Sequence, residues 1–200
     1  MFDAKLRRIV DPPVDKIARW LVRSGASANA LTAIGALIGI GAALAIAEHQ
    51  FVAGLTLILL NRILDGLDGA VARISGPTEY GGYLDTLADF LFYVAVPIGF
   101  AWAATANQLP ALALVASFTL SAVSFLAFAA IAARRGNEHG AHGPKAFIYS
   151  TGLMEGGETI AFFILFCLFP AYFPVLALVF AALCILTVAQ RIALAAKTFA

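Results

Sequence analysis

Six apolar stretches of about 20 residues dominate the chain and set the limits on its fold. They lie at approximately 28–47, 51–73, 82–106, 109–133, 146–169 and 171–190. Helices of this length satisfy their own backbone hydrogen bonds inside a bilayer, where no water is present. The composition agrees, because 62% of the residues are hydrophobic and only 12% are charged. The sequence therefore predicts one all-α integral membrane domain over residues 1–200, with six transmembrane helices.

All 13 lysine and arginine residues fall on one side of these predicted helices. They lie before the first helix, around the end of the second, between the fourth and fifth, and at the C-terminus. By the positive-inside rule this side is the cytoplasm, so we expect a multi-pass protein with cytoplasmic N- and C-termini. The net charge of +1 does not indicate nucleic-acid binding.

The segment before the first predicted transmembrane helix is expected to form an amphipathic helix over residues 12–24. Pro12 suits the first turn of such a helix. Ile17, Trp20 and Leu21 share one face at spacings i, i+3 and i+4, and basic residues lie elsewhere. This pattern is typical of a helix on an anionic membrane surface. A plain basic flank explains the same charges, so both interpretations stay open.

The stretch DGLDGAVARISGPTEYGGYLDTLAD, residues 65–89, places carboxylates between two apolar helices. Asp65 and Asp68 are spaced i, i+3 near the end of the second helix, and Asp85 and Asp89 are spaced i, i+4 near the start of the third. Both ends lie on the cytoplasmic side, so we expect the four carboxylates to converge across a hairpin. Hard oxygen donors suit Mg²⁺ or Mn²⁺. The sequence therefore predicts a divalent-cation site, with two ions, at the cytoplasmic face.

Small residues and an arginine accompany these acids. Gly69 and Ala72 share the helix face of Asp65 and Asp68, which removes bulk where a ligand approaches the backbone. Arg73 follows, and its guanidinium group is suited to phosphate. Solvated acids at helix ends would explain one or two carboxylates, but not four with a glycine on the same face. The pattern predicts a phosphorylated ligand.

These residues resemble the signature of the CDP-alcohol phosphatidyltransferases, membrane enzymes of phospholipid synthesis. The matching positions are Asp65, Asp68, Gly69, Ala72, Arg73, Gly81, Asp85 and Asp89. Seven residues separate Arg73 from Gly81, one fewer than is usual in the family. Asn29, Leu31 and Thr32 are similar to a segment that often opens the first transmembrane helix in that family.

The resemblance implies a reaction and roles for the matching residues. A CDP-linked donor, in many members CDP-diacylglycerol, would be attacked by a small alcohol, and CMP would leave; a CDP-headgroup donor with diacylglycerol as acceptor stays open. The implied metal ligands are Asp65, Asp68, Asp85 and Asp89, of which Asp89 is alternatively the general base. The implied nucleotide and phosphate contacts are Gly69, Ala72, Arg73 and Gly81, with Thr32 nearby. The family also suggests a homodimer.

Further charged residues are candidates for an acceptor site. Arg134, Arg135 and Lys145 lie between the fourth and fifth predicted helices, where they could bind an acceptor phosphate or lipid headgroups, or simply follow the topology. Glu155 and Glu158 fall within the fifth predicted helix, where unpaired acids are costly. They either line the acceptor cavity or pair with a basic side chain.

Two other classes of protein remain open. A membrane prenyltransferase would use the acidic spacings, including Asn61 with Asp65, to hold a prenyl diphosphate, although Gly69, Ala72 and Arg73 argue against it. A cation-coupled transporter is expected to carry its acids near the bilayer midplane within repeated halves. Most acids of this chain lie near the cytoplasmic side instead.

Overall fold

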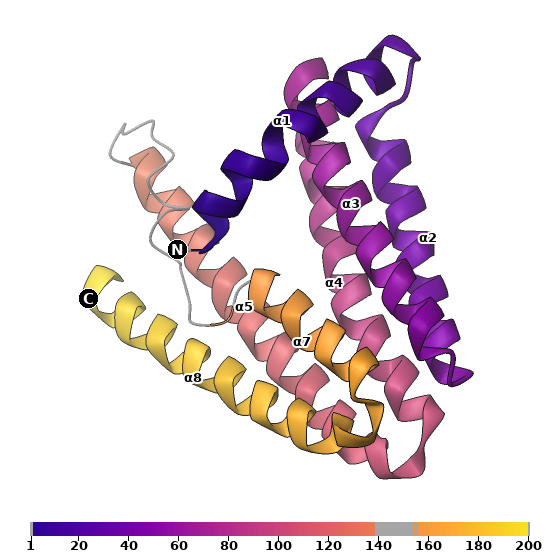
Figure 1. Ribbon diagram of the computed structural model, residues 1–200. Helices are drawn as coiled ribbons and strands as arrows, with labels where there is room; N and C mark the ends of the chain where they lie inside the picture. The colour runs from indigo at the N-terminus through magenta and orange to yellow at the C-terminus, as the bar shows by residue number, and fades with distance from the viewer. Residues whose placement is uncertain (1, 139–153, 155, 200) are drawn as a thin grey trace.

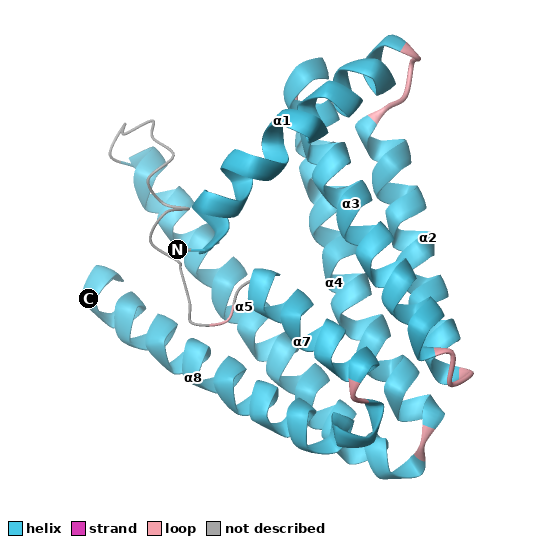
Figure 2. Cartoon of the chain, in the orientation of Figure 1, coloured by secondary structure: helices cyan, strands magenta, loops and turns pink. Residues whose placement is uncertain are grey.

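The computed structural model describes residues 2–138, 154 and 156–199, and these residues form helices joined by short connections, with no strand (Figure 1, Figure 2). The α-helices are α1 (Phe2–Arg23), α2 (Ala28–Ala47), α3 (Phe51–Ser75), α4 (Glu79–Ala103), α5 (Gln108–Glu138), α7 (Gly156–Leu168) and α8 (Phe173–Phe199). Two 3-10 turns, η1 (Thr105–Asn107) and η2 (Pro170–Tyr172), precede α5 and α8. The prediction of an all-α protein is confirmed.

Four segments are long and apolar enough to cross a membrane: Ala28–Ala47, Glu79–Ala103, Thr105–Arg135 and Pro170–Phe199. Helix α3 has 25 residues, but its second half carries the charged residues of the motif. Helix α7 has 13 residues, and the start predicted for the fifth transmembrane helix, 146–153 and 155, lies outside the described residues. The structure therefore supports a multi-pass membrane protein, and the count of six transmembrane helices stays a prediction.

The N-terminal helix is longer than predicted, because α1 begins at Phe2 and not at Pro12. A proline inside a helix removes one backbone hydrogen bond and costs about 3 kcal/mol or more, but it does not by itself end the helix. The upstream residues FDAKLRRIV carry apolar and basic residues that favour a helix. Pro12 and the adjacent Pro13 therefore lie within α1, and the prediction of a first turn at Pro12 was wrong.

Buried side chains join α1 to the helices that carry the motif. Ala18 of α1 is fully buried in a small cluster with Leu31 of α2 and with Leu67 and Val71 of α3. Leu21 packs against the same cluster, whereas Ile17 and Trp20 are exposed. The apolar face predicted for this helix is thus divided between contact with α2 and α3 and an exposed side.

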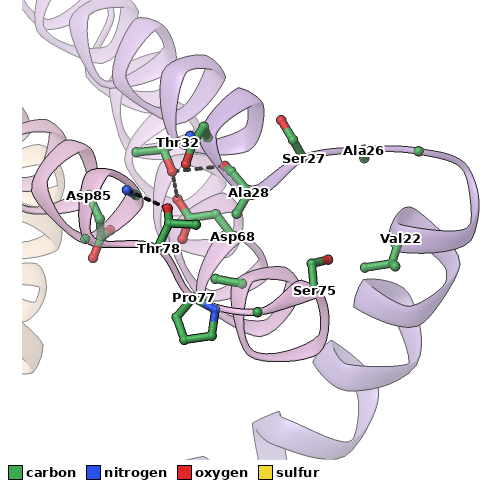
Figure 3. Close-up of a pocket in the computed structure, with 17 residues that line it drawn as sticks. Val22, Ala26, Ser27, Ala28, Thr32, Asp68, Ser75, Pro77, Thr78 and Asp85 are labelled. Carbon is green, nitrogen blue, oxygen red and sulfur yellow. Dashed lines mark hydrogen bonds between the residues drawn. The ribbon is translucent and has the colours of Figure 1, made fainter.

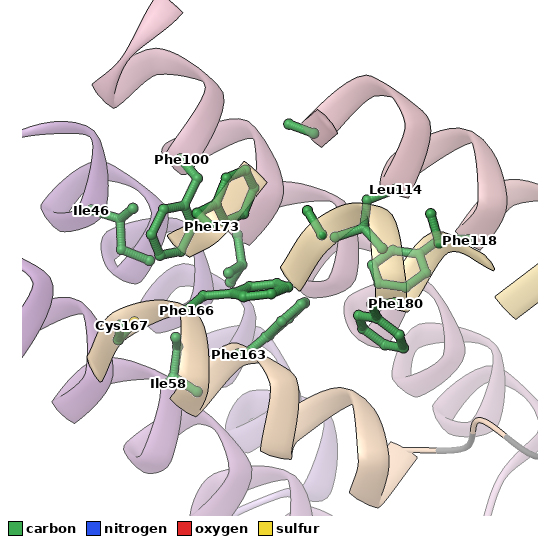
Figure 4. Packing of buried hydrophobic residues seen from close by; sticks show 14 of the residues in the cluster. Ile46, Ile58, Phe100, Leu114, Phe118, Phe163, Phe166, Cys167, Phe173 and Phe180 are labelled. Carbon is green, nitrogen blue, oxygen red and sulfur yellow. The ribbon is translucent and has the colours of Figure 1, made fainter. Parts of the chain in front are cut away.

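An aromatic core links α4 to α7 and α8 (Figure 4). The rings of Phe100 and Phe173 stack with their centroids 4.4 Å apart, and those of Phe162 and Phe180 stack at 4.3 Å. Removing one such ring from a core typically costs about 3–5 kcal/mol. This core fixes α4, whose first turns carry two of the aspartates, against the C-terminal helices.

Helices α2 and α4 approach each other closely at Gly99. A Cβ atom on Gly99 would lie 2.5 Å from the carbonyl oxygen of Ala43, so only glycine permits this contact without a shift of the backbone. The contact holds α4 beside α2, and α3 also packs along α2. The ends of α2, α3 and α4 that carry the motif therefore lie together.

Candidate functional site

A three-residue connection brings the end of α3 to the start of α4. Gly76 adopts a φ of +97°, a left-handed conformation that favours glycine, and Pro77 follows it. Thr78 then caps α4, because its hydroxyl accepts a hydrogen bond of 3.0 Å from the backbone N–H of Gly81. The hairpin predicted between the two pairs of aspartates is therefore present.

Asp68 is the most enclosed of the four motif aspartates, with 4% of its surface exposed. The hydroxyl of Thr32, on α2, donates a hydrogen bond of 2.6 Å to Asp68 Oδ2 (Figure 3). Hydrogen bonds to a charged carboxylate are shorter and stronger than neutral ones. This bond ties the start of α2 to the acidic face of α3.

A cavity of about 430 Å³ opens beside this pair (Figure 3). Its walls come from the connection before α2, from α2 and α3, and from the hairpin into α4. The predicted site residues that line it are Thr32, Asp68, Gly69, Ala72, Gly81 and Asp85. Its volume lies within the range of small-molecule sites, about 300–1,000 Å³.

A second cavity of about 10 Å³ adjoins the first, and Thr32 and Asp68 line both. Asp65 and Asp89 line only the small one, together with Arg62. Arg62 Nη1 donates to Asp89 Oδ1 at 3.0 Å and lies 3.6 Å from Asp65 Oδ2. The four carboxylates therefore surround two adjoining spaces, with an arginine between two of them.

The sequence predicts that the four carboxylates converge across the hairpin, and the structure distributes them over the two adjoining cavities. Within the described residues, no group of three or more His, Cys, Asp or Glu residues lies close enough to hold a metal ion as a set. Arg62 lies between Asp65 and Asp89, and its positive charge contacts both carboxylates.

The donors around both cavities nevertheless fit a hard divalent cation. Carboxylate and hydroxyl oxygens line them, and neither lining includes a cysteine or a histidine. Oxygen donors of this kind are preferred by Mg²⁺ and Mn²⁺ over softer metals.

Sequence reasoning did not assign Arg62 to this site. Its Nε donates to Asn61 Oδ1 at 2.8 Å, and its guanidinium carbon lies 4.4 Å from the centre of the Phe92 ring. Asn61 is itself buried and donates to the carbonyl of Gly35 at 2.8 Å. The i, i+3 spacing of Arg62 and Asp65 was the signal that could have found the pair.

Arg73 points toward α1. Its Nη2 lies 3.9 Å from Asp15 Oδ1, and both side chains are largely exposed. A Cβ on Gly69 would lie 3.5 Å from Arg73 Nη1, so the guanidinium group also lies over the glycine of the motif. Asp15 had not been predicted to take part, because nothing in the sequence indicates that α1 crosses the end of α3.

The basic candidates between the fourth and fifth predicted helices lie elsewhere. Arg135 donates to the carbonyls of Thr198 and Phe199 at 3.2 and 2.8 Å, at the end of α8. Neither Arg134 nor Arg135 is among the residues that line the two cavities. Lys145 lies outside the described residues.

The acidic candidates of the fifth predicted helix are only partly described. Glu155 lies outside the described residues, and Glu158 is exposed in the first turn of α7. A Cβ on the neighbouring Gly156 would lie 3.5 Å from the hydroxyl of Tyr93, and the guanidinium carbon of Arg62 lies 5.8 Å from the Tyr93 ring centre. The side chain of Tyr93 therefore lies between the start of α7 and Arg62.

The signature residues lie within one region of similarity that covers most of the chain. The family model for CDP-alcohol phosphatidyltransferase matches residues 26–195. The chain belongs to the CDP-alcohol phosphatidyltransferase family. The candidate site thus lies in a phosphatidyltransferase. The two other classes considered from the sequence, a membrane prenyltransferase and a cation-coupled transporter, are not supported.

Curated relatives agree with this assignment. Inner membrane protein YnjF of Escherichia coli is 44% identical over 193 residues, which cover 96% of this chain and 94% of that protein. An archaetidylinositol phosphate synthase of Pyrococcus horikoshii is 35% identical over 100 residues, about half of each chain (49% and 53%).

The fold of this phosphatidyltransferase is also similar to solved structures of the Mycobacterium tuberculosis phosphatidylinositol phosphate synthase PgsA1. The form with CDP-DAG bound aligns with a TM-score of 0.65 at 24% identity, covering 90% of this chain and 92% of that one. The form in complex with manganese and citrate aligns with a TM-score of 0.66 at 23% identity, covering 90% and 88%. At these identities the likeness concerns the fold.

Proposed function

We propose that this phosphatidyltransferase transfers a phosphatidyl group from CDP-diacylglycerol to a small alcohol and releases CMP. The observation that carries the proposal is the cavity of about 430 Å³, because six residues of the predicted site line it. The binding of CDP-DAG by the Mycobacterium tuberculosis synthase, which has a similar fold, supports this choice of donor.

The four aspartates would hold Mg²⁺ or Mn²⁺, two ions per chain. Asp68 and Asp85 face the large cavity, and Asp65 and Asp89 face the small one. When bound, such ions stabilise the charge on the attacking and leaving oxygens of a phosphoryl transfer. The manganese complex of the Mycobacterium tuberculosis synthase supports a divalent ion.

The remaining motif residues would bind and orient the donor. Gly69, Ala72 and Gly81 leave room for the nucleotide and its phosphates along the cavity wall. Arg73 lies over Gly69 and would exchange its weak, exposed contact with Asp15 for a phosphate oxygen. Thr32 would hold Asp68 in place through its hydrogen bond.

The acceptor hydroxyl would form a new bond to the phosphorus that carries the lipid, and the bond from that phosphorus to the CMP oxygen would break. Asp89 would accept the hydroxyl proton or act as a further metal ligand. Arg62 holds Asp89 Oδ1 and so orients this carboxylate. A positioned base of this kind contributes about 10²- to 10⁴-fold to a rate.

The acceptor side is proposed to lie at the start of α7, near Tyr93, with Glu158 at its edge and Glu155 close by in sequence. Lys145 and Arg134 would add positive charge for an acceptor that carries a phosphate. Arg135 is a weaker candidate, because it donates to the carbonyls at the end of α8.

The test is CMP release from CDP-diacylglycerol by the purified protein in detergent, with Mg²⁺ or Mn²⁺ and with serine, glycerol phosphate or inositol phosphate as acceptor. We expect metal-dependent CMP release with one of these acceptors, and a loss of at least about 100-fold in Asp85→Asn. Glu48→Gln, which removes an exposed carboxylate outside both cavities, is the matched control and should retain activity. An absence of CMP from CDP-diacylglycerol with every acceptor would contradict the proposal. CMP released only from a CDP-headgroup donor with diacylglycerol would contradict the proposed donor.

A further inference from the structure

Arg62 occupies an unusual place for a cation, between two carboxylates of the proposed metal site. Its side chain is 17% exposed, and its Nη1 reaches both Asp89 Oδ1 at 3.0 Å and Asp65 Oδ2 at 3.6 Å. A guanidinium group at these distances supplies the positive charge that two neighbouring carboxylates require.

Neutral groups hold this arginine in place independently of the acids. The Oδ1 atom of Asn61 accepts from Arg62 Nε, and the other end of the Asn61 amide is bonded to the carbonyl of Gly35 on α2. The Phe92 ring supports the guanidinium from its face at 4.4 Å. Because Asn61 is 3% exposed, the support for Arg62 is part of the packed interior.

The positive charge is not shared evenly among the carboxylates. Arg62 contacts Asp65 and Asp89 beside the small cavity. Asp68, which lines both cavities, accepts from the neutral hydroxyl of Thr32, and Asp85 faces the large cavity. An ion beside Asp68 and Asp85 therefore meets carboxylates that are free of the arginine contact. An ion that approaches Asp65 and Asp89 meets a cation already in contact with both.

We propose that Arg62 is an internal counter-cation that competes with a divalent ion for Asp65 and Asp89. The inference rests on the proposed function in one respect, namely that these carboxylates bind a divalent ion. Without the ion, the charge of Arg62 offsets the repulsion between Asp65 and Asp89. The same charge weakens the binding of a divalent ion to these two carboxylates. Arg62 is thus a positioning residue and does not itself touch the reacting atoms.

The test is the binding of Mn²⁺ alone to the purified protein, with free Mn²⁺ measured by electron paramagnetic resonance. Arg62→Gln removes the charge but keeps a polar side chain, and we expect its dissociation constant for Mn²⁺ to fall by at least about 10-fold. Arg62→Lys keeps the charge but lacks the planar guanidinium group, and we expect a smaller fall in the dissociation constant for Mn²⁺. Arg23→Gln, which removes an exposed cation on α1, is the matched control and should stay within about 2-fold.

Thermal unfolding without metal provides a second measurement. Arg62→Gln should unfold at a lower temperature than the wild-type protein, because two carboxylates lose their cation, and added Mn²⁺ should raise this temperature more than it does in the wild type. A merely structural arginine would lower the unfolding temperature without enlarging the shift caused by Mn²⁺.

Unchanged or weaker Mn²⁺ binding in Arg62→Gln would overturn the inference. If that variant does not fold, Arg62→Lys decides, since a dissociation constant equal to that of the wild type would equally overturn it. An absence of Mn²⁺ binding in the wild type and in every variant would overturn it together with the metal site. Tighter binding in Arg62→Gln without any CMP release from the wild type would leave the inference standing and contradict the proposed function alone.

Discussion

The hydrogen bond from Thr32 to Asp68 connects two helices through one buried polar contact. Thr32→Val preserves the shape of the side chain but removes the donor, so the Asp68 carboxylate loses its partner on α2. A hydrogen bond to a charged group is worth about 1.5–3 kcal/mol, so we expect kcat/KM for CMP release to fall by about 10-fold or more.

Thr32→Ser is the control for this prediction, because it retains the hydroxyl group. Its kcat/KM should stay within about 3-fold of the wild-type value. If Thr32→Val keeps full activity with CDP-diacylglycerol, the bond does not position Asp68 for catalysis.

The sequence predicted which residues lie around the two cavities better than it predicted the contacts that those residues make. Helical spacing is sufficient to place Asp65 and Asp68 on one face of α3, and all four aspartates line the two cavities. Spacing does not show how α3 is rotated against its neighbours. For this reason the contacts of Arg62 with Asp89 and of Arg73 with Asp15, each between two helices, were not predicted.

At the scale of elements, the start of α4 depends on a close approach to α2. A Cβ on Gly81 would lie 3.0 Å from Thr78 Oγ1 and 3.1 Å from Asn29 Oδ1, whereas nothing lies within 4 Å of a Cβ on Gly82. Alanine favours a helix over glycine by about 1 kcal/mol at either position. At Gly81 the added methyl group would crowd Thr78 Oγ1 and Asn29 Oδ1, and we expect the cost of this crowding to exceed the gain in helix propensity.

We therefore expect Gly81→Ala to be about 1–2 kcal/mol less stable than Gly82→Ala, as measured by thermal unfolding of the two variants in detergent. Gly82→Ala is the matched control, because it introduces the same methyl group one residue along the same helix. Equal stabilities of Gly81→Ala and Gly82→Ala would contradict this prediction, because they would show that Asn29 and Thr78 can move away from the added methyl group without a loss of stability.

The bounds of the helices were predictable where the apolar pattern has a clear end. The predicted segment 28–47 coincides with α2, and the second segment differs from α3 only by two residues at its end. The start of α1 was not predictable in the same way, since two prolines indicated a first turn but lie inside the helix. Tertiary contact through Ala18, which sequence periodicity does not reveal, holds this helix on α2 and α3.

At the scale of the whole molecule, the candidate site and the stacked rings of the main core lie in different parts of the fold. The cavities lie among α1, α2, α3 and α4, whereas the stacked rings of the core join α4 to α7 and α8 (Figure 1, Figure 4). Helices α2, α3 and α4 contribute to both, and of these α4 carries the stacked ring of Phe100 together with Asp85 and Asp89. We therefore expect a change in the stacked rings to affect the candidate site through α4.

The orientation of the whole molecule in the membrane follows from its charges. All 13 lysine and arginine residues lie on one side of the predicted helices, so the connection between α2 and α3, at Gln50, should face away from the cytoplasm, and the end of α1 should face it. We expect a cysteine at Gln50→Cys to react with an impermeant maleimide in intact cells, and one at Arg23→Cys to react only after the membrane is opened.

The native cysteines provide a low background for this labelling, because Cys167 and Cys184 are both buried, with 6% and 3% of their surfaces exposed. The unsubstituted protein should therefore label weakly on either side of the membrane. The reverse pattern, with Arg23→Cys labelled in intact cells and Gln50→Cys protected, would place the acidic site on the outer face. A donor and an acceptor made in the cytoplasm would then reach the site only after crossing the bilayer, and the proposed reaction would lose its direct access to them.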